Sequence, residues 1–359
     1  MPDTSPPDPH VIRLMDASLN RASEGARVVE DYARFVLDDA HLSRLGKELR
    51  HGIAAAGATL PMADRLACRN TPGDVGTAIT TASESQRADA ADVCNASLGR
   101  LQEALRSLEE YGKTIDPALG AAFERLRYDA YTLAAGLGTT ERGRNRLGDA
   151  RLYVLIEAGP SDEAFEQLTE SLCAAGVQVL QLRDKRLDDR RLVERARIMA
   201  AVCRRHGVVS IVNDRADIAV AAGADGVHIG QDELTVADAR SVVGPGRLVG
   251  VSTHRIEQAR AARLAGADYL GVGPTFPSTT KSFADFPGID FVRQVAAEIT
   301  LPAFAIGGIT AENISEVVAA GLRRVAVGAA VTGASDPAAA VRSLREALGA
   351  PVGGEGSSG

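Results

Sequence analysis

The stretch Val208-Val-Ser-Ile-Val-Asn-Asp214 is a β-branched apolar run that ends in two polar residues. Continuous apolar runs of this length are typical of strands that are buried on both faces of a parallel sheet. Similar runs recur through the second half of the chain, with amphipathic helical patterns between them and one after the last. The predicted strands cover residues 151–157, 177–183, 208–214, 226–230, 247–252, 269–274, 302–308 and 323–328.

This alternation of strands and helices predicts an α/β fold, a (β/α)₈ or TIM barrel, over residues 151–348. The alternative architecture is a doubly wound open sheet. It is less favoured because the glycine-rich GxGxxG turn of that fold does not follow the first strand, where Glu157-Ala-Gly-Pro160 stands instead.

The composition narrows the class of protein. Hydrophobic residues make up 45 % of the 359 residues, aromatic residues only 4 %, and Trp is absent, so Ala, Val, Leu and Gly must fill the core. A net charge of −7 argues against a nucleic-acid-binding surface. The four cysteines form no CxxC pair and suggest neither disulfides nor a zinc site. Without a signal peptide or an apolar run near the ~20 residues of a membrane span, we expect a cytoplasmic protein.

Residues 11–137 differ from the barrel segment in composition and pattern. They are rich in Arg and Glu at helical spacing and have few strand-like runs. They predict a separate all-helical domain that precedes the barrel. The Gly-rich polar stretch 138–150 is the predicted linker. Residues 1–10 and the tail 349–359 are predicted to be disordered.

An internal repeat occupies the helical segment. Ala17–Tyr32 and Ala96–Tyr111 share the pattern Ala-Ser-Leu-x-Arg-x-x-Glu-x-x-Arg-x-x-Glu-x-Tyr, which predicts two similar halves. The charged positions lie along one helix face and indicate a salt-bridged ladder, whereas the alternative is an anion site made by paired arginines. The domain itself is interpreted as a dimerisation module, which would make the protein a homo-oligomer, or as a regulatory module.

Polar side chains follow the second, third and fourth predicted strands, where barrel enzymes carry their reactive groups. Alternation directs Gln181, Arg183 and Lys185 the same way, and Arg and Lys both suit phosphate oxygens. Asn213 and Asp214 end the third strand. Asp214 could hold Mg²⁺ together with Glu233 or Asp232, or these carboxylates could cap helices and pair with arginine. An inward-facing His228 would lie near a substrate ring, although a histidine satisfied within the core is the alternative.

The later strands end in hydroxyl groups and glycines. Ser252 ends the fifth strand, and the loop after the sixth carries Ser278, Thr280 and Lys281, which suit a departing pyrophosphate anion. Gly307 and Gly308 end the seventh strand before a helix and predict a phosphate site made of backbone N–H groups. The motifs together predict two anionic sites, as an enzyme needs to join a pyrophosphate-activated substrate to a monophosphorylated one.

The barrel segment resembles the thiamine phosphate synthase family throughout residues 151–348. The matching motifs run in family order and spacing: Gln181-Leu-Arg-Asp-Lys185, Asn213-Asp214, Gly226-Val-His-Ile-Gly-Gln231, Gly250-Val-Ser252, Gly273-Pro274 with Ser278-Thr-Thr-Lys281, and Ile306-Gly-Gly-Ile309.

The resemblance implies that 4-amino-5-hydroxymethyl-2-methylpyrimidine diphosphate condenses with 4-methyl-5-(2-phosphoethyl)thiazole. Thiamine phosphate and pyrophosphate would form with Mg²⁺ as the cofactor, through a pyrimidine carbocation that the thiazole nitrogen captures. The implied diphosphate ligands are Arg183, Lys185, Asn213, Ser252 and Lys281. The implied Mg²⁺ ligands are Asp214 and Glu233, the pyrimidine contacts are Gln181 and His228, and the thiazole-phosphate contacts are Ser278, Thr280, Gly307 and Gly308.

The chain departs from the family pattern at two positions. Glu233 stands where the family usually has Asp, and Gly328 stands where it usually has Ser. The related thiazole tautomerases share the barrel but tend to lose the diphosphate-binding set, so its retention here favours the synthase. The helical segment resembles extensions of some bacterial thiamine phosphate synthases.

Overall fold

The computed structural model describes residues 7–75, 86–277 and 287–349. Most of the two segments predicted to be disordered at the chain ends lies outside these residues. The chain consists of two units, Met1–Leu137 and Gly138–Gly359.

The second unit is a closed barrel of eight parallel strands in sequence order, β1 to β8, so the predicted fold class is confirmed and the open sheet is excluded. Every predicted strand is present, with ends that differ by at most two residues. The strands are β1 (Leu152–Ile156), β2 (Val179–Leu182), β3 (Val209–Asn213), β4 (Gly226–Ile229), β5 (Leu248–Thr253), β6 (Tyr269–Val272), β7 (Ala303–Ile306) and β8 (Val325–Val327).

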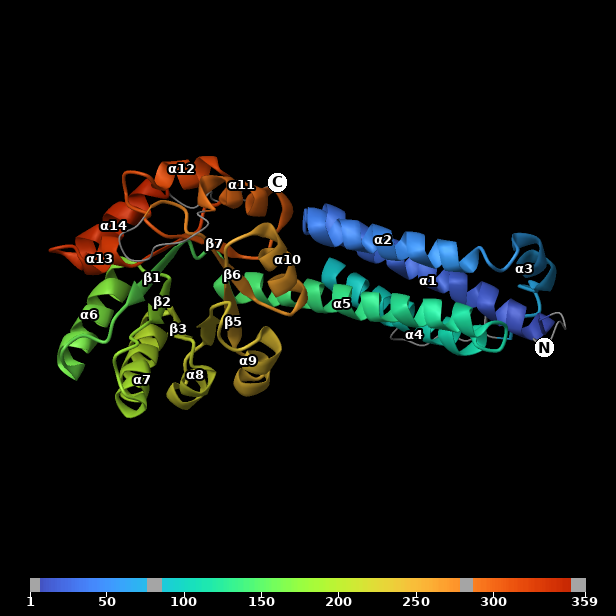
Figure 1. Ribbon diagram of the computed structural model, residues 1–359, viewed down its shortest axis with the longest axis horizontal. Coiled ribbons are helices and arrows are strands. Elements are labelled where there is room, and N and C mark those ends of the chain that lie inside the picture. The colour runs from blue at the N-terminus through green and yellow to red at the C-terminus, as the bar shows by residue number, and fades with distance from the viewer. Residues whose placement is uncertain (1–6, 76–85, 278–286, 350–359) are drawn as a thin grey trace. The chain divides into compact units, whose positions relative to one another are not determined.

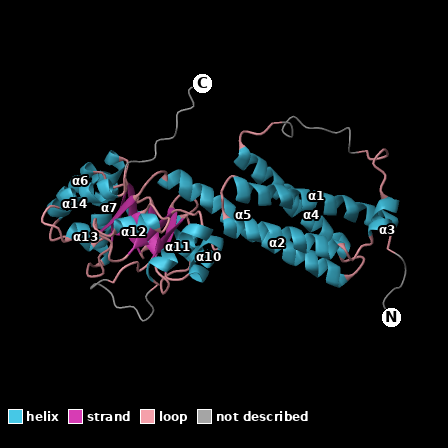
Figure 2. Ribbon diagram, turned by 90° about the horizontal axis from the view of Figure 1, so that it is seen from above, coloured by secondary structure: helices cyan, strands magenta, loops and turns pink. Residues whose placement is uncertain are grey.

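Helices surround this ring of strands (Figures 1 and 2). The first of these helices, Asp162–Ala175, has clear start and stop signals. Ser161 caps its N-terminus by accepting from the N–H of Ala164, and Gly176, with a φ of 101°, caps its C-terminus. The helices are α6 (Asp162–Ala175), α7 (Asp189–His206), α8 (Ala216–Ala222), α9 (Val236–Val243), α10 (Ile256–Leu264), α11 (Gly288–Glu298), α12 (Ile314–Ala319), α13 (Ala329–Thr332) and α14 (Pro337–Ala347).

Two hydrophobic clusters follow the alternation of side chains along each strand. The larger cluster lies between strands and helices and includes Leu152, Val154 and Ile156 of β1. The smaller cluster fills the barrel interior and includes Tyr153 of the same strand. Its other buried members are Leu147, Ala150, Val179, Ile211, Leu248, Tyr269, Phe304 and Ala326. The interior is thus a packed core, and the positions nearer the C-terminal strand ends remain for a site.

The first unit contains α1 (Pro9–Phe35), α2 (Ala40–Gly57), α3 (Met62–Cys68), α4 (Ala90–Gly112) and the first part of α5 (Pro117–Leu147). The long helices lie side by side (Figure 1). The two copies of the repeat lie on α1 and α4. These helices approach closely at Gly25, where a Cβ atom would lie 3.0 Å from the carbonyl oxygen of Ser97. None of the helices in the described part of the chain has the length and apolar composition of a membrane span.

Corresponding glutamates of the repeat are buried and paired. Glu30 accepts from Arg50 of α2 at 2.7 Å, and Glu109 accepts from Arg127 of α5 at 2.7 Å. The Arg127 and Lys113 side chains lower the pKa of Glu109 against the opposing effect of burial. Arg106 of the same helix also pairs with Glu109, at 3.1 Å, so the buried glutamates of the repeat are neutralised by arginines of their own and of neighbouring helices.

The boundary between the two units lies at Leu137, where the predicted linker begins, but residues 138–147 are helical and not an irregular connector, because α5 continues through them to Leu147. Glycine in this stretch suggested a chain break, yet Gly143 permits close packing. A Cβ atom there would lie 2.0 Å from the carbonyl oxygen of Asp268. Arg142 forms an ion pair with Asp268 at 2.5 Å, and Leu147 belongs to the interior cluster of the barrel. The end of α5 is therefore the floor of the barrel, at the N-terminal ends of its strands.

Candidate functional site

A ring of polar side chains faces the interior of the barrel near the C-terminal strand ends. Gln181 of β2, Asn213 of β3, His228 of β4 and Ser252 of β5 continue the inward alternation set by the interior cluster. The amide Nε2 of Gln181 donates to Oδ1 of Asn213 at 3.3 Å. Four residues predicted from separate motifs thus lie on adjacent strands, where they could line the pocket of a small polar ring.

His228 links this ring to deeper tyrosines. Its Nε2 lies 2.9 Å from the Ser252 hydroxyl, and its Nδ1 lies 3.2 Å from the Tyr269 hydroxyl. The Tyr269 and Tyr153 hydroxyls are 3.1 Å apart. Burial lowers the pKa of His228 to about 4, against the weaker opposing effect of Asp214. Burial also raises the pKa of both tyrosines, so the whole chain of groups is uncharged at neutral pH.

Glycines make room for this arrangement. A Cβ atom at Gly250 would lie 2.0 Å from the Tyr269 ring, and one at Gly271 would lie 3.3 Å from His228. Gly250 and Ser252 belong to the same motif, and both lie on β5. The glycine is needed because the tyrosine ring crosses the barrel directly over it.

Lys185 stands between two predicted metal ligands. Its Nζ lies 3.1 Å from Oδ2 of Asp214 and 3.6 Å from Oε1 of Glu233. Asp214 has a φ of 60°, an uncommon value outside glycine, and its N–H donates to the carbonyl of His228 at 2.8 Å. A cation therefore already lies between these carboxylates. Mg²⁺ is bound in many sites by one or two carboxylates with water and substrate phosphates, so this donor set fits it.

Arg183 follows β2, and its N–H donates to the carbonyl of Ile156 at 2.8 Å. Its half-buried guanidinium has no ion-pair partner among the described residues. The nearby Arg186 differs, because it pairs with Glu157 at 2.6 Å and with Asp184 at 3.0 Å. Of these two arginines, Arg183 is therefore the one that remains available to an anion.

The loops after β6 and β7 are joined by backbone hydrogen bonds. The N–H of Thr275 donates to the carbonyl of Ile306 at 2.9 Å, and that of Phe276 donates to the carbonyl of Gly307 at 3.0 Å. Gly307 and Gly308 have φ values of 100° and 65°. The helix expected directly after Thr310 begins only at Ile314, so the predicted phosphate site is a glycine loop followed by a turn.

Three predicted site residues, Ser278, Thr280 and Lys281, lie outside the described residues. The structure also adds contacts that the motifs did not reveal. Tyr153 and Tyr269 could have been found from their inward register, whereas the contacts of Gln231 and Asn313 depend on three-dimensional proximity. Nε2 of Gln231 donates to the carbonyl of Ser252 at 2.6 Å, and Asn313 contacts the loop after β7.

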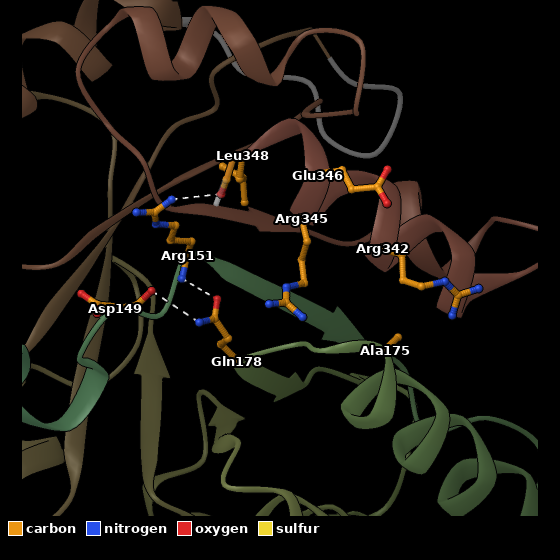
Figure 3. A pocket seen from close by; sticks show the side chains of 9 residues that line it. Asp149, Arg151, Ala175, Gln178, Arg342, Arg345, Glu346 and Leu348 are labelled. Carbon is orange, nitrogen blue, oxygen red and sulfur yellow. Dashed lines mark hydrogen bonds between the residues drawn. The ribbon is translucent and has the colours of Figure 1, made fainter. Parts of the chain in front are cut away.

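A cavity of about 480 Å³, whose lining side chains are drawn in Figure 3, lies at the N-terminal ends of the strands, opposite to these residues. Its lining comes from the segments before β1 and β2 and from the end of α14. Arg345 lies against the C-terminal glycine of α6, because a Cβ atom at Gly176 would be 1.8 Å from its guanidinium. This placement suits the negative end of a helix, so Arg345 has a structural explanation.

Comparisons with known proteins agree with the barrel geometry. The family model described as thiamine monophosphate synthase matches residues 152–331, and the model described as the ThiD2 family matches residues 13–136. Thiamine-phosphate synthase of Rhodopirellula baltica is 48 % identical over 91 % of this chain and 88 % of its own. The synthase of Synechocystis is 39 % identical over 93 % of this chain and 95 % of its own.

A solved structure is similar to the barrel unit. Thiamine phosphate pyrophosphorylase from Pyrococcus furiosus is 32 % identical, with a TM-score of 0.50, over 57 % of this chain and 96 % of its own. The relatives thus extend over both units, whereas this solved structure matches little more than half of the chain.

Proposed function

This chain belongs to the thiamine-phosphate synthase family, and we propose that its barrel mouth joins a hydroxymethylpyrimidine diphosphate to a thiazole phosphate. In this reaction the bond between the pyrimidine methylene carbon and the diphosphate oxygen breaks, and its electron pair leaves with pyrophosphate. The thiazole nitrogen then donates its lone pair to that carbon. The observation that carries the proposal is Lys185 between Asp214 and Glu233, next to the interior polar ring.

The diphosphate would bind at the cationic side of the mouth. Arg183 offers a planar fork without an ion-pair partner among the described residues, and Lys185 supplies a mobile charge. Asn213, Ser252 and Lys281 would complete this set. Such a clamp favours bond breaking, because it stabilises the charge that develops on the leaving group and needs no general base.

Asp214 and Glu233 would hold Mg²⁺, which when bound supplies positive charge to the diphosphate oxygens. Their carboxylates are hard oxygen donors that already share one cation, Lys185 Nζ. Binding of the metal would release Lys185 from the carboxylates toward the diphosphate. The same two residues therefore control both the metal and the position of the lysine.

Gln181 and His228 would contact the pyrimidine ring. Because burial keeps His228 neutral, it can donate from one ring nitrogen and accept at the other. If Tyr153 donates to Tyr269, the Tyr269 proton is left for Nδ1 of His228, so Nε2 carries the other proton. A neutral site also avoids placing a positive imidazolium beside a developing carbocation.

The thiazole phosphate would bind the Gly307 and Gly308 amides, together with Ser278 and Thr280 of the preceding loop. The joined loops after β6 and β7 support this assignment, because they bring the two segments together. A tautomerase activity is less favoured, since the relatives that match most of this chain are named thiamine-phosphate synthases.

For the helical unit we propose a non-catalytic role in assembly or regulation. The ion pairs Glu30–Arg50 and Glu109–Arg127 join neighbouring helices of the unit, which supports a packing role for its buried charges.

The test is thiamine phosphate formation by the purified full-length protein, with both substrates and Mg²⁺, with and without EDTA. We expect equal amounts of thiamine phosphate and pyrophosphate, and loss of both with EDTA. Folded protein that makes neither product would overturn the proposed reaction. Product formation unaffected by EDTA would overturn only the role of the metal.

A further inference from the structure

Asn313 makes two hydrogen bonds to the glycine loop after β7. Its Oδ1 accepts from the N–H of Thr310 at 2.9 Å, and its Nδ2 donates to the carbonyl oxygen of Gly308 at 2.9 Å. The side chain is half-buried and lies directly before α12. It therefore holds both ends of the turn that closes the loop.

Each of the three consecutive carbonyls in this loop has a donor. The carbonyl of Ile306 accepts from Thr275 N–H at 2.9 Å and from its hydroxyl at 3.1 Å. The carbonyl of Gly307 accepts from the N–H of Phe276 at 3.0 Å, and that of Gly308 accepts from Asn313. Only the last of these three carbonyls depends on a side chain alone.

A trans peptide directs its C=O and its following N–H in opposite directions. The Gly273–Pro274 bond is the only cis peptide in the described ranges, so the loop peptides are trans. Fixing the three carbonyls therefore fixes the N–H groups of Gly307, Gly308 and Ile309. The Gly307 N–H faces the Ala326 carbonyl in the ladder between β7 and β8, whereas the Gly308 and Ile309 N–H groups have no hydrogen-bond acceptor among the described residues. Successive free N–H groups of this kind form a concave anion site.

The glycines make such fixing necessary. Gly307 and Gly308 both have positive φ, and glycine populates many other conformations at little cost. The loop after β6 packs closely against Gly308, where a Cβ atom would lie 2.8 Å from the carbonyl oxygen of Pro277. The Gly308–Ile309 peptide is held on the other side by Asn313.

We infer that Asn313 is a positioning residue for phosphate binding, because it directs the Ile309 N–H toward the phosphate of the thiazole substrate. The inference rests on the proposed function and adds a group that does not itself touch the substrate. Without Asn313, the Gly308–Ile309 peptide can rotate and turn its carbonyl dipole toward the anion. Binding of the phosphate would weaken, whereas binding of the pyrimidine diphosphate would not change.

The test uses steady-state kinetics of the full-length chain, with each substrate varied at saturation of the other. Asn313→Ala should raise the KM for thiazole phosphate by about tenfold, as expected for loss of a hydrogen bond to a charged group. The KM for the pyrimidine diphosphate should change by less than about twofold. Asn313→Asp keeps the acceptor for Thr310 but replaces the donor to Gly308 with a carboxylate oxygen that repels that carbonyl, so its defect should be at least as large.

Ser315→Ala on the same helix is the matched control, because Ser315 is exposed, and it should behave as wild type. Calorimetric binding of the thiazole alcohol, which lacks the phosphate, gives a readout independent of turnover. Asn313→Ala should weaken binding of the thiazole phosphate and leave binding of the alcohol unchanged. If both weaken equally, or if both KM values rise together, Asn313 has only a structural role.

Failure of the inference can be separated from failure of the reaction. Wild-type protein that makes no thiamine phosphate overturns the proposed function. Active wild-type protein with an unchanged thiazole-phosphate KM in Asn313→Ala overturns only the role of Asn313. Asn313→Ala that does not fold would be replaced by Asn313→Asp, whose size is the same.

Discussion

Nδ1 of His228 lies 3.2 Å from the hydroxyl oxygen of Tyr269, across the interior of the barrel. The two residues are 41 positions apart in the chain and meet because both face inward on strands near one another in the ring. The contact places a buried phenol behind the imidazole, on the side away from Ser252. If Tyr153 donates to Tyr269, the Tyr269 proton goes to Nδ1 of His228, and the contact then determines that Nε2 carries the imidazole proton.

Tyr269→Phe tests this relationship. The substitution keeps the ring that packs over Gly250 and removes the hydrogen bond to His228, so both imidazole tautomers become populated. We expect turnover to fall about five- to tenfold, the effect of one hydrogen bond of about 1 kcal/mol. Nitrogen NMR of the imidazole would report the tautomers. Tyr153→Phe is the graded control and should have a smaller effect, whereas an equal effect would contradict the tautomer argument.

The low pKa of His228 predicts a stability that depends on pH. Its folded value of about 4 lies below the ordinary value of about 6.5, so the unfolded chain binds more protons between these pH values. The free energy of unfolding should therefore fall as the pH drops from 6.5 toward 4, by up to about 3 kcal/mol from this group. Urea unfolding of wild type and His228→Gln would measure it. Identical pH slopes in the two proteins would contradict the prediction.

Mg²⁺ binding should weaken when Asp214 or Glu233 loses its charge and strengthen when Lys185 does. Asp214→Asn and Glu233→Gln should each raise the Mg²⁺ concentration for half-maximal activity by more than about tenfold. Lys185→Met should increase Mg²⁺ affinity in the absence of substrate, because the carboxylates lose their internal cation, and yet lower turnover. Asp232→Asn is the control, since only Glu233 of this neighbouring pair contacts Lys185. A larger effect at Asp232 would move the metal site to that residue.

Gly328 has room for the hydroxyl that the family pattern usually carries there. Among the described residues, a Cβ atom there would come within 4 Å only of the Cβ of Leu155, at 3.9 Å. Gly328→Ser should therefore lower the KM for thiazole phosphate by a few-fold, about threefold for one weak hydrogen bond. Gly250→Ala is the contrasting variant and should destabilise the fold, because its Cβ would overlap the Tyr269 ring. An increased KM in Gly328→Ser would show that the site does not accept a hydroxyl.

The end of α5 predicts where the barrel can be shortened. A chain that begins at Gly138 should fold, because it keeps the Arg142–Asp268 ion pair and Leu147. A chain that begins at Asp149 leaves the buried Asp268 with fewer partners and should lose on the order of 3 kcal/mol of stability. Thermal unfolding of both truncated chains measures the difference. Equal melting temperatures would mean that residues 138–148 do not support the barrel.

Much of the barrel could be predicted from local sequence. Runs such as Val208–Val212 must be buried on both faces, and their number and spacing leave few arrangements other than a closed ring. Gly143 shows where this reasoning fails. Its absent side chain suggests a flexible break, but the same absence lets a helix touch the Asp268 carbonyl, and only the fold distinguishes the two.

The site was predicted as separate motifs, each at the end of a strand. The sequence could group Gln181 with Lys185 because they are close in the chain. It could not show that Lys185 reaches Glu233 or that Asn313 holds Gly308, because such contacts depend on how the loops close in space. Tyr153 and Tyr269 were missed because aromatic residues in strands are usually core, and here they are core with a polar function.

The N–H groups of Gly308 and Ile309 belong to the main chain, so only a proline substitution removes their hydrogen-bonding capacity, whereas almost any substitution removes an arginine. A phosphate-binding site made of main-chain groups is kept when the side chains of the interior ring are substituted. Changes at Gln181 or His228 could therefore alter the ring that is recognised while the phosphate anchor stays in place. For protein engineering, the glycine loop would bind the phosphate group of an ester substrate, and the side chains of the interior ring could be changed independently of it.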